Sequence, residues 1–578
     1  MLSRRPMVCA AFVLASACTR GARKDVTPPL AESAPEAAAR EAGAQDPPAL
    51  TRAETIEHIL SRATFGASPQ DRARLQLAGV AVFLEEQLHP ETIDDSALDG
   101  RLAAFDVLRK GPDTLVQNLV AQRKMRQEEK RRDEMIKDAP PPPDDAMGAP
   151  ESPPPAKAPK GLRKQLGKAG SGPGFDYVAQ LSQAKLLRAV SSERQLQEVM
   201  ADFWFNHFNV FAGKDQEAAL LPGYEERVLR PNALGSFPDL LEDTAHSPAM
   251  LIYLDNWRSS APTPPVPARR WAPWLRNNQG KAPKPQKRGL NENYARELLE
   301  LHTLGVDGGY TQQDIVEVAR CFTGWTVDQP QKDPRFIFRA QLHDFGEKRV
   351  LGHLIPAGRG EEDGALVLKI LEEHPATARF IARKLARRFV SDDPPEELVE
   401  EIAYTYTRTR GDIRSMLRTL FESPAFWSRR ALRAKVRSPL ELVAAAVRGL
   451  GASVDDPMSL ARAVARIGQP LYAAQPPTGY PDLAQTWLGS GALLARIDFG
   501  LQLASGQLEG VKVDLSRLAG GGPEQTLDRA ASELGATDLS EKTRGYILDQ
   551  LRQAPPKPDL QAARAVGLLL GAPELQRR

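Results

Sequence analysis

The stretch from residue 291 to residue 325, NENYARELLELHTLGVDGGYTQQDIVEVARCFTGW, predicts two helices joined by a short turn. Asn291 is suited to cap the first helix, and Gly305 is suited to end it. Thr311 with Asp314 three residues later is a capping signal for the second helix, which Gly324 ends. Apolar residues recur at helical spacing in both segments, so this stretch predicts a helical fold.

Similar capped patterns continue over most of the remaining chain. Ser192 with Gln195 three residues later predicts a capping box, and Pro248 suits a first helical position. Strand signals are scarce, because only residues 336–340 alternate clearly and could pair with residues 350–351. We therefore expect a mostly α fold, a multi-helix orthogonal bundle with at most a short β-hairpin.

The composition is that of a globular protein with no charge bias. The 578 residues include 76 Lys and Arg against 74 Asp and Glu, which gives a formal net charge of +2. This balance excludes the basic surface expected of a nucleic-acid-binding protein. Aromatic residues make up 6% of the chain, which argues against a carbohydrate-binding β-sandwich.

The N-terminus carries an export signal. Arg4 and Arg5 precede an apolar run at residues 7–17 that is too short to cross a membrane, as is typical of a secretory signal peptide. The arginine pair also resembles a twin-arginine signal, so the general secretory route and the twin-arginine route both remain open.

A lipid anchor is predicted at the end of this signal. Residues 14–18, LASAC, resemble a lipobox in which Cys18 would be lipidated and become the new N-terminus. Ordinary cleavage is the alternative. We expect residues 1–18 to be a signal peptide with a lipobox, and the mature protein to be periplasmic or anchored in the outer membrane through Cys18.

Shifts in composition divide the rest of the chain. Two tracts are rich in Pro and lack helical periodicity, as expected of insertions without a core. The predicted regions are a disordered tether at 19–50, an N-terminal helical part at 51–138, a Pro-rich disordered insertion at 139–172, a core helical part at 173–440 with a flexible insertion at 261–288, and a C-terminal helical region at 441–578.

The helix predicted at 291–305 has one acidic, amide-bearing face. Asn293, Arg296, Glu297 and Glu300 share this face, whereas His302 lies roughly 140° from Glu297 on a regular helix. Metal ligands must converge, so these residues do not predict a three-ligand metal site. An ordinary ion pair between Arg296 and Glu300 is the alternative to a functional site.

Two further groups of polar residues stand out. The aromatic segment 203–211 predicts burial, which makes Asn206, His207 and Asn209 buried polar groups that need partners. A histidine in such surroundings is often a satisfied core residue. His343 and Asp344 lie in the turn of the predicted hairpin, where either a site or ordinary turn chemistry fits them.

The motif at 291–325 closely resembles the signature of domain-of-unknown-function family 1800. Five other segments resemble this family too, at residues 60–66, 203–210, 248–256, 343–344 and 435–441. The resemblance implies an exported, mostly helical bacterial protein with no assigned activity. It also implies a partner, an exported protein similar to sulfatases and phosphatases. The residues that the family motifs bring together are Asn206, His207, Asp255, Asn256, Asn293, Arg296, Glu297, Glu300, His302, His343 and Asp344.

Two classes of function follow. One is an envelope hydrolase in which Glu297 or Glu300 acts as acid or base, Arg296 holds an anionic group, and His207 or His343, beside Asp344, relays protons. In that case the residues expected to bind are Asn206, Asp255, Asn256, Asn293 and His302. The other is a scaffold or partner protein whose buried polar groups specify the fold. No complete catalytic set is visible, so the second class is favoured, and the sequence names no cofactor.

Overall fold

The structure is a computed structural model that describes residues 49–137, 172–261, 289–536, 538–555 and 557–578. The predicted signal peptide with Cys18 lies outside the described residues. The tether and the two Pro-rich insertions lie outside them as well, apart from a few residues at their edges. From Ala49 to Arg578 the described chain forms one compact unit.

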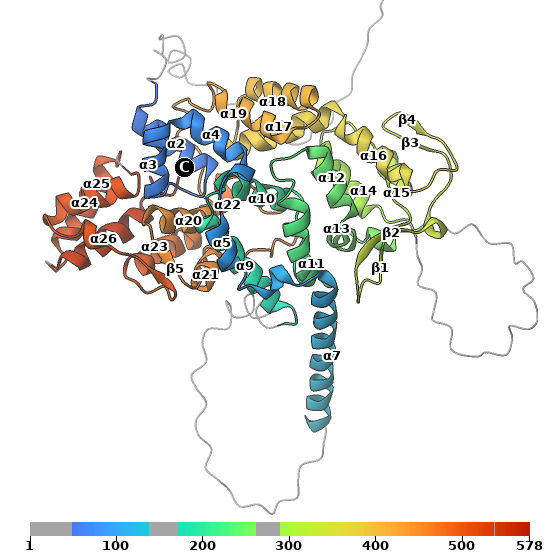
Figure 1. Cartoon of the computed structure of the whole chain (residues 1–578), viewed down its shortest axis with the longest axis horizontal. Coiled ribbons are helices and arrows are strands. Elements are labelled where there is room, and N and C mark those ends of the chain that lie inside the picture. The colour runs from blue at the N-terminus through green and yellow to red at the C-terminus, as the bar shows by residue number, and fades with distance from the viewer. Residues whose placement is uncertain (1–48, 138–171, 262–288, 537, 556) are drawn as a thin grey trace, which may run out of the picture. The chain divides into compact units, whose positions relative to one another are not determined.

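Helices make up most of this unit (Figure 1). The first set is α2 (Arg52–Ala63), α3 (Pro69–Ala78), α4 (Val80–Leu88), η1 (Pro90–Thr92), α5 (Ser96–Leu102), α6 (Asp106–Arg109) and α7 (Pro112–Lys137). The second set is α9 (Phe175–Ser191), α10 (Gln195–His207), α11 (Glu217–Tyr224), η2 (Glu225–Leu229), α12 (Phe237–His246), α13 (Pro248–Tyr253), η3 (Asn256–Arg258), α14 (Asn293–Glu297), η5 (Leu298–Thr303) and α15 (Gln312–Cys321).

The C-terminal half continues in the same way. Its helices are η6 (Ala340–Leu342), α16 (Glu362–Glu372), α17 (Pro375–Phe389), α18 (Glu396–Thr409), α19 (Ile413–Glu422), α20 (Pro439–Gly449), α21 (Met458–Ile467), α22 (Ala484–Trp487), α23 (Ser490–Ala504), η7 (Ser516–Leu518), α24 (Gly522–Glu533), α25 (Glu541–Arg552) and α26 (Pro558–Gly571). The mostly α prediction is confirmed.

The strands of the described residues form three separate antiparallel pairs. The strands are β1 (Trp325–Asp328) with β2 (Arg335–Phe338), β3 (Lys348–Val350) with β4 (His353–Ile355), and β5 (Ser453–Val454) with β6 (Val511–Lys512). The predicted pairing of residues 336–340 with 350–351 is wrong, because Phe336 pairs with Val327 and Val350 pairs with His353. In the first two pairs each strand instead pairs with a near neighbour in sequence, which requires only a short connection, whereas β5 and β6 are separated by three helices.

Helix caps were predicted with mixed success. Thr311 and Asp314 form the expected reciprocal capping box of α15, and Pro248 begins α13. The box at Ser192 is wrong, because α10 begins only at Gln195. The Ser192 hydroxyl donates to Asp95 Oδ2 (2.6 Å) instead, so a tertiary partner replaces the local one.

The helix predicted at 291–305 is not regular. It begins as α14 and continues as the π-helix η5, where the Leu304 N–H donates to Leu299 O (2.9 Å) five residues back. A π turn holds an extra residue and changes the direction of the side chains that follow. The regular-helix geometry assumed for His302 is therefore wrong.

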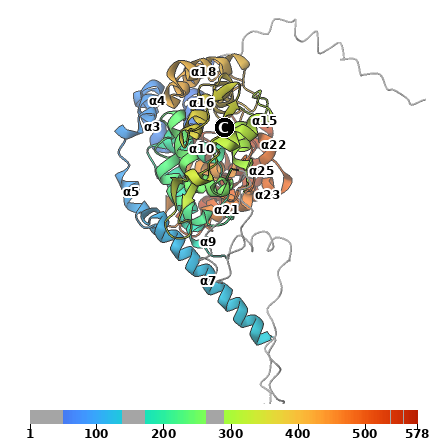
Figure 2. The same ribbon diagram turned by 90° about the vertical axis from the view of Figure 1, so that its right-hand side faces the viewer.

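The N-terminal helices are attached to distant parts of the chain. The His58 ring Nε2 lies 2.8 Å from Phe426 O, and the Arg62 guanidinium donates to Ala431 O (2.5 Å), so α2 lies against the segment that follows α19 (Figure 1). Both side chains are at most 1% exposed. Helix α7 differs, because its second half is largely exposed and extends away from the other helices (Figure 2). Within the described ranges, no helix combines the length and the apolar character needed to cross a membrane.

Candidate functional site

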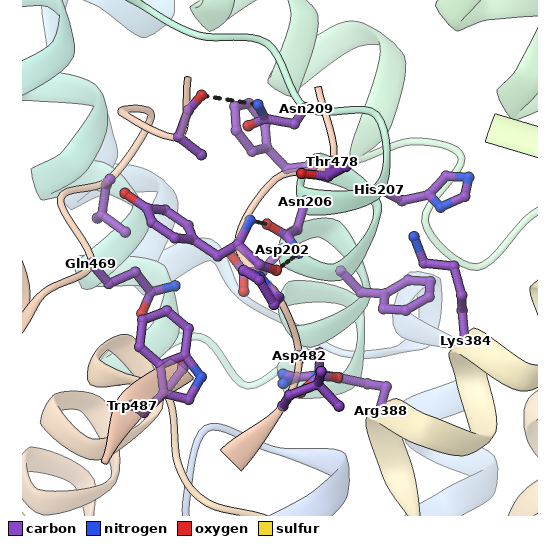
Figure 3. A pocket seen from close by; sticks show the side chains of 18 of the residues that line it. Asp202, Asn206, His207, Asn209, Lys384, Arg388, Gln469, Thr478, Asp482 and Trp487 are labelled. Carbon is purple, nitrogen blue, oxygen red and sulfur yellow. Dashed lines mark hydrogen bonds between the residues drawn. The ribbon is translucent and has the colours of Figure 1, made fainter. Parts of the chain in front are cut away.

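A cavity of about 230 Å³ lies where α9, α10 and α17 meet the loop 469–483 and α22 (Figure 3). Its lining mixes charged, amide and aromatic side chains, a composition typical of small-molecule sites. The residues around it are Lys185, Asp202, Phe203, Phe205, Asn206, His207, Asn209, Lys384, Arg387, Arg388, Ser438, Gln469, Leu471, Tyr472, Ala474, Thr478, Tyr480, Pro481, Asp482, Leu483 and Trp487.

The loop that forms one wall is fixed by two asparagines at the end of α10. Asn206 Nδ2 donates to Tyr480 O (2.8 Å), and the Tyr480 N–H donates back to Asn206 Oδ1 (2.7 Å). Asn209 Nδ2 donates to two further loop carbonyls, Ala474 O (3.0 Å) and Pro476 O (2.9 Å). The amides that the sequence marked as needing partners therefore hold the loop in place.

Close packing at Gly479 adds to this attachment. Its φ is +67°, and an added Cβ would lie 2.4 Å from Asn206 O. Only glycine combines this backbone conformation with so close an approach.

Two cations of the lining are neutralised by carboxylates. Lys185 Nζ lies 3.0 Å from Glu225 Oε1 and 3.2 Å from Asp202 Oδ1. Arg388 pairs with Glu441, which Arg578 also contacts at 3.0 Å. Burial works to lower the pKa of Lys185, but the charges of Glu225 and Asp202 outweigh it and raise the pKa. Both cations therefore stay charged and paired.

Lys384 and Arg387 differ from these, although they lie on the same helix α17. Among the described residues, no carboxylate oxygen lies within 4 Å of either side chain, and Arg387 Nε donates only to the main-chain oxygen of Asp392 (3.1 Å). Burial lowers the pKa of Lys384 to about 8, with Arg387 adding to the effect and Asp482 opposing it. The cavity thus holds two cations without a carboxylate in contact.

His207 lies beside Lys384 and is 2% exposed. Its Nε2 is 3.1 Å from His302 O, and because a carbonyl oxygen can only accept, Nε2 carries the hydrogen. Nδ1 then presents a lone pair, which has no partner among the described residues. Burial, the charge of Lys384 and the His302 ring hold the pKa of His207 well below its usual value. The Lys384 amino group points toward this neutral ring (Figure 3).

Of the residues predicted to form a site, Asn206 and His207 line the cavity. His302 lies behind His207, with ring centroids 6.2 Å apart, and burial lowers its pKa to about 3. It orients His207 through its main-chain oxygen. The π turn, which the sequence did not reveal, determines how His302 meets His207.

The acidic face of α14 and η5 is a separate surface that does not line the cavity. Arg296 pairs with Glu292 (3.4 Å), so the alternative of an Arg296–Glu300 pair is wrong. Burial raises the pKa of Glu297, and the charge of Glu300 adds to this. Asn293 is exposed and donates weakly to Leu254 O (3.4 Å).

Asp255 and Asn256 lie at the start of η3. Asp255 has φ +61° and accepts from Lys214 (2.7 Å). Asn256 is fully buried and donates to Phe322 O (3.2 Å) and Trp325 O (3.1 Å). Asn256 therefore holds η3 against the segment that leads into β1.

His343 and Asp344 belong to a third group, between β2 and β3. The His343 ring nitrogens face Thr323 O (2.7 Å) and Asp363 Oδ2 (3.3 Å). Asp344 accepts from Arg320 (2.8 Å). Within the described ranges, no group of three or more His, Cys, Asp or Glu side chains is arranged to hold a metal ion.

The sequence analysis missed the residues that distinguish this cavity. Lys384 and Arg387 lie in the basic stretch RKLARR of α17, which resembles an ordinary solvated helix face. The loop 469–483 carried only turn signals from Pro and Gly. No spacing in the sequence indicates that these segments meet α10.

Comparison with known proteins gives a family and no closer relative. The model of one family, described as "Protein of unknown function (DUF1800)", matches residues 58–577. No curated protein matches the chain, and no solved structure matches it.

Proposed function

The chain belongs to the DUF1800 family of proteins of unknown function, and from this premise we propose that it is an exported envelope protein whose central cavity binds a small anionic molecule. The observation that carries the proposal is the pair of cations, Lys384 and Arg387, which face the cavity without a carboxylate in contact. Both side chains are half-buried, and a half-buried cation without a carboxylate in contact carries a desolvation cost that an anionic ligand would offset.

The remaining lining suits a ligand with both polar and flat apolar parts. Asn206 holds the loop that carries Tyr480, and the Tyr480 and Trp487 rings lie 5.8 Å apart on one wall. Lys185 and Arg388 are already neutralised, so they do not compete for the anion. The positive charge that is left to bind an anion therefore comes from Lys384 and Arg387, which lie one turn apart on α17.

Binding is tested by the unfolding midpoint in the presence of phosphate, sulfate, acetate or citrate. We expect at least one of these anions to raise the midpoint of the wild type, and Lys384→Met and Arg387→Met to abolish the increase. Arg383→Met is the matched control, because Arg383 lies on the same helix but pairs with Glu396 (2.5 Å) away from the cavity. An equal response of all four proteins to every anion would refute the proposal.

The hydrolase built on Glu297, Glu300, Arg296 and His207 has less support, because only His207 lines the cavity. The raised pKa of Glu297 is the observation in its favour. A screen of ester and phosphoester substrates with Glu297→Gln as the comparison tests it. Hydrolysis that the variant retains in full would remove Glu297 from any catalytic role.

Export and the partner rest on the sequence alone. The N-terminal signal supports export, and fatty-acid labelling that is lost in Cys18→Ala would support the lipid anchor. The family resemblance supports association with an exported sulfatase- or phosphatase-like protein. Failure to co-purify the two proteins from envelope extracts would count against that association.

A further inference from the structure

Lys384 has surroundings that suit covalent chemistry as well as binding. The inference that follows rests on the proposed function, since it names the class of anion that the cavity takes. The relevant features are an amine with no carboxylate in contact, a neutral imidazole beside it and a guanidinium one turn along the same helix.

We propose that the Lys384 amine condenses reversibly with the carbonyl carbon of a small anionic aldehyde or ketone, whose anionic group Arg387 holds. A 2-oxo acid is the simplest member of this class. Lys384 and Arg387 are three residues apart on α17, so their side chains leave the helix on the same side and face the cavity together.

The reaction balances without a further reagent. The nitrogen lone pair of the amine attacks the carbonyl carbon, which forms the N–C bond of a carbinolamine. The carbon–oxygen bond then breaks, the oxygen leaves as water with the two hydrogens lost from nitrogen, and an imine remains. His207 Nδ1 is the acceptor that takes a proton from nitrogen and returns it to the departing oxygen.

The protonation states agree with this chemistry. An amine attacks only in its neutral form, and a lysine in water has a pKa of about 10.4. The pKa of Lys384 is lowered to about 8, which makes its neutral fraction at pH 7.5 about two hundred times larger. The pKa of His207 lies well below its usual value, so the ring keeps its lone pair at neutral pH.

The structure provides an internal control in the same cavity. Lys185 also lines it, but Glu225 and Asp202 hold this amine in its charged form. Exposed Lys369, on α16, serves as a freely accessible reference. A reaction that depended only on access would favour Lys369.

The test uses glyoxylate as the probe, with borohydride to reduce any imine. Reduction leaves a carboxymethyl group on the reacting lysine, and peptide mass spectrometry locates it. At pH 7.5 we expect Lys384 to be modified at least tenfold faster than Lys369, and Lys185 to remain unmodified. Lys384→Arg, which keeps the charge, should abolish the product, and Arg387→Gln should slow its formation at least tenfold.

Glycolate, which has an alcohol where glyoxylate has an aldehyde, separates the two proposals. If glycolate raises the unfolding midpoint in a manner dependent on Arg387 but glyoxylate leaves Lys384 unmodified, the imine is refuted and anion binding stands. Modification of Lys384 no faster than that of Lys369 also refutes the proposal, because the cavity would then give Lys384 no special reactivity. If neither probe acts at the cavity, the imine is refuted, and anion binding falls too if phosphate, sulfate, acetate and citrate also leave the midpoint unchanged.

Discussion

Lys384 occupies a position that weakens the folded state. Burying an amine disfavours its charged form, and here no carboxylate compensates within contact distance. Natural proteins accept such costs mainly at functional sites. The free energy of unfolding of a Lys384 variant therefore tests, without any ligand, whether this residue is kept for function rather than for stability.

We predict that Lys384→Met stabilises the protein at pH 7. Because the folded pKa of about 8 lies below the ordinary 10.5, the unfolded state binds more protons between these values, and wild-type stability rises with pH across this window. The penalty is nearly complete at pH 7, about one unit below the folded pKa, where its removal is worth about 3 kcal/mol. Denaturant unfolding at pH 7 and pH 10.5 measures it.

The gain should shrink to a few tenths of a kcal/mol near pH 10.5, where the wild-type amine is neutral in the folded state and about half neutral in the unfolded state. Lys369→Met, at an exposed position on α16, should change stability little at either pH. A Lys384→Met protein less stable than the wild type at pH 7 would show that the amine is structural.

At the scale of elements, helix α16 is held to strand β3 by a buried ion pair. Lys348 Nζ lies 2.7 Å from Asp363 Oδ2, and neither side chain is exposed. Burial works to raise the pKa of Asp363, but hydrogen bonds with His343 and Lys348 outweigh it and lower the pKa. The polar residues around His343 therefore have a structural role, which is to hold α16 to β3.

Asp363→Asn should destabilise the protein by roughly 3–5 kcal/mol, because it leaves the buried Lys348 charge with main-chain oxygens but no carboxylate to neutralise it. Asp363→Leu combined with Lys348→Met should recover most of the loss. Since the Asp363 pKa is lowered, its stabilisation is present above the ordinary pKa of 3.8 and is lost as the pH falls through the folded value. The free energy of unfolding of Asp363→Asn should therefore fall less steeply than that of the wild type as the pH is lowered. An equal dependence on pH in the two proteins would contradict this role of Asp363.

Helices were predictable wherever their signals were local. The Thr311–Asp314 box depends on residues three apart, and the structure confirms it. The box at Ser192 failed because Asp95, which is distant in sequence, takes the hydroxyl, and Gln195 accepts from the Phe65 N–H (3.0 Å). Tertiary partners override local patterns in ways that one sequence does not reveal.

At the scale of the whole molecule, distant segments are joined through the chain beyond α19. Lys435 and Arg578 exchange main-chain hydrogen bonds (2.8 and 3.3 Å), and the Arg437 N–H donates to Gln576 O (2.9 Å). Arg62 of α2 donates to nearby Ala431. The first and last helices are therefore attached to one short stretch.

Removing Arg577 and Arg578 should lower the unfolding midpoint by a few degrees and also loosen α2. The deletion leaves main-chain groups of Lys435 unpaired and removes a partner of Glu441. Amide hydrogen exchange should become faster in residues 52–63 as well as near Lys435. Arg552→Ala, which removes only exposed ion pairs with Glu524 and Asp549, is the control. Faster exchange confined to the residues near Lys435 would show that the two ends are not coupled.

The cavity could not be predicted from the sequence, because segments that are distant in the chain form it. Its walls come mainly from α9, α10, α17 and the loop 469–483, and only Asn206, His207 and Asn209 carried a signal, as polar groups among aromatics. The acidic face at Glu297 was conspicuous in the sequence but forms a surface of its own. A spacing pattern identifies residues on one element, whereas this site depends on how four segments pack.

The π turn at Leu298–Thr303 affects how the protein tolerates a change in length. It contains one residue more than an α turn, so deletion of a single codon, for example that of Leu301, would let the segment close as an ordinary helix. His302 O would then move from His207 Nε2, and an altered imidazole NMR signal in a stably folded protein would report it. We therefore expect the chain to tolerate the loss of one residue here while the chemistry of its cavity changes, which makes this turn a place where evolution can alter the site in a single step.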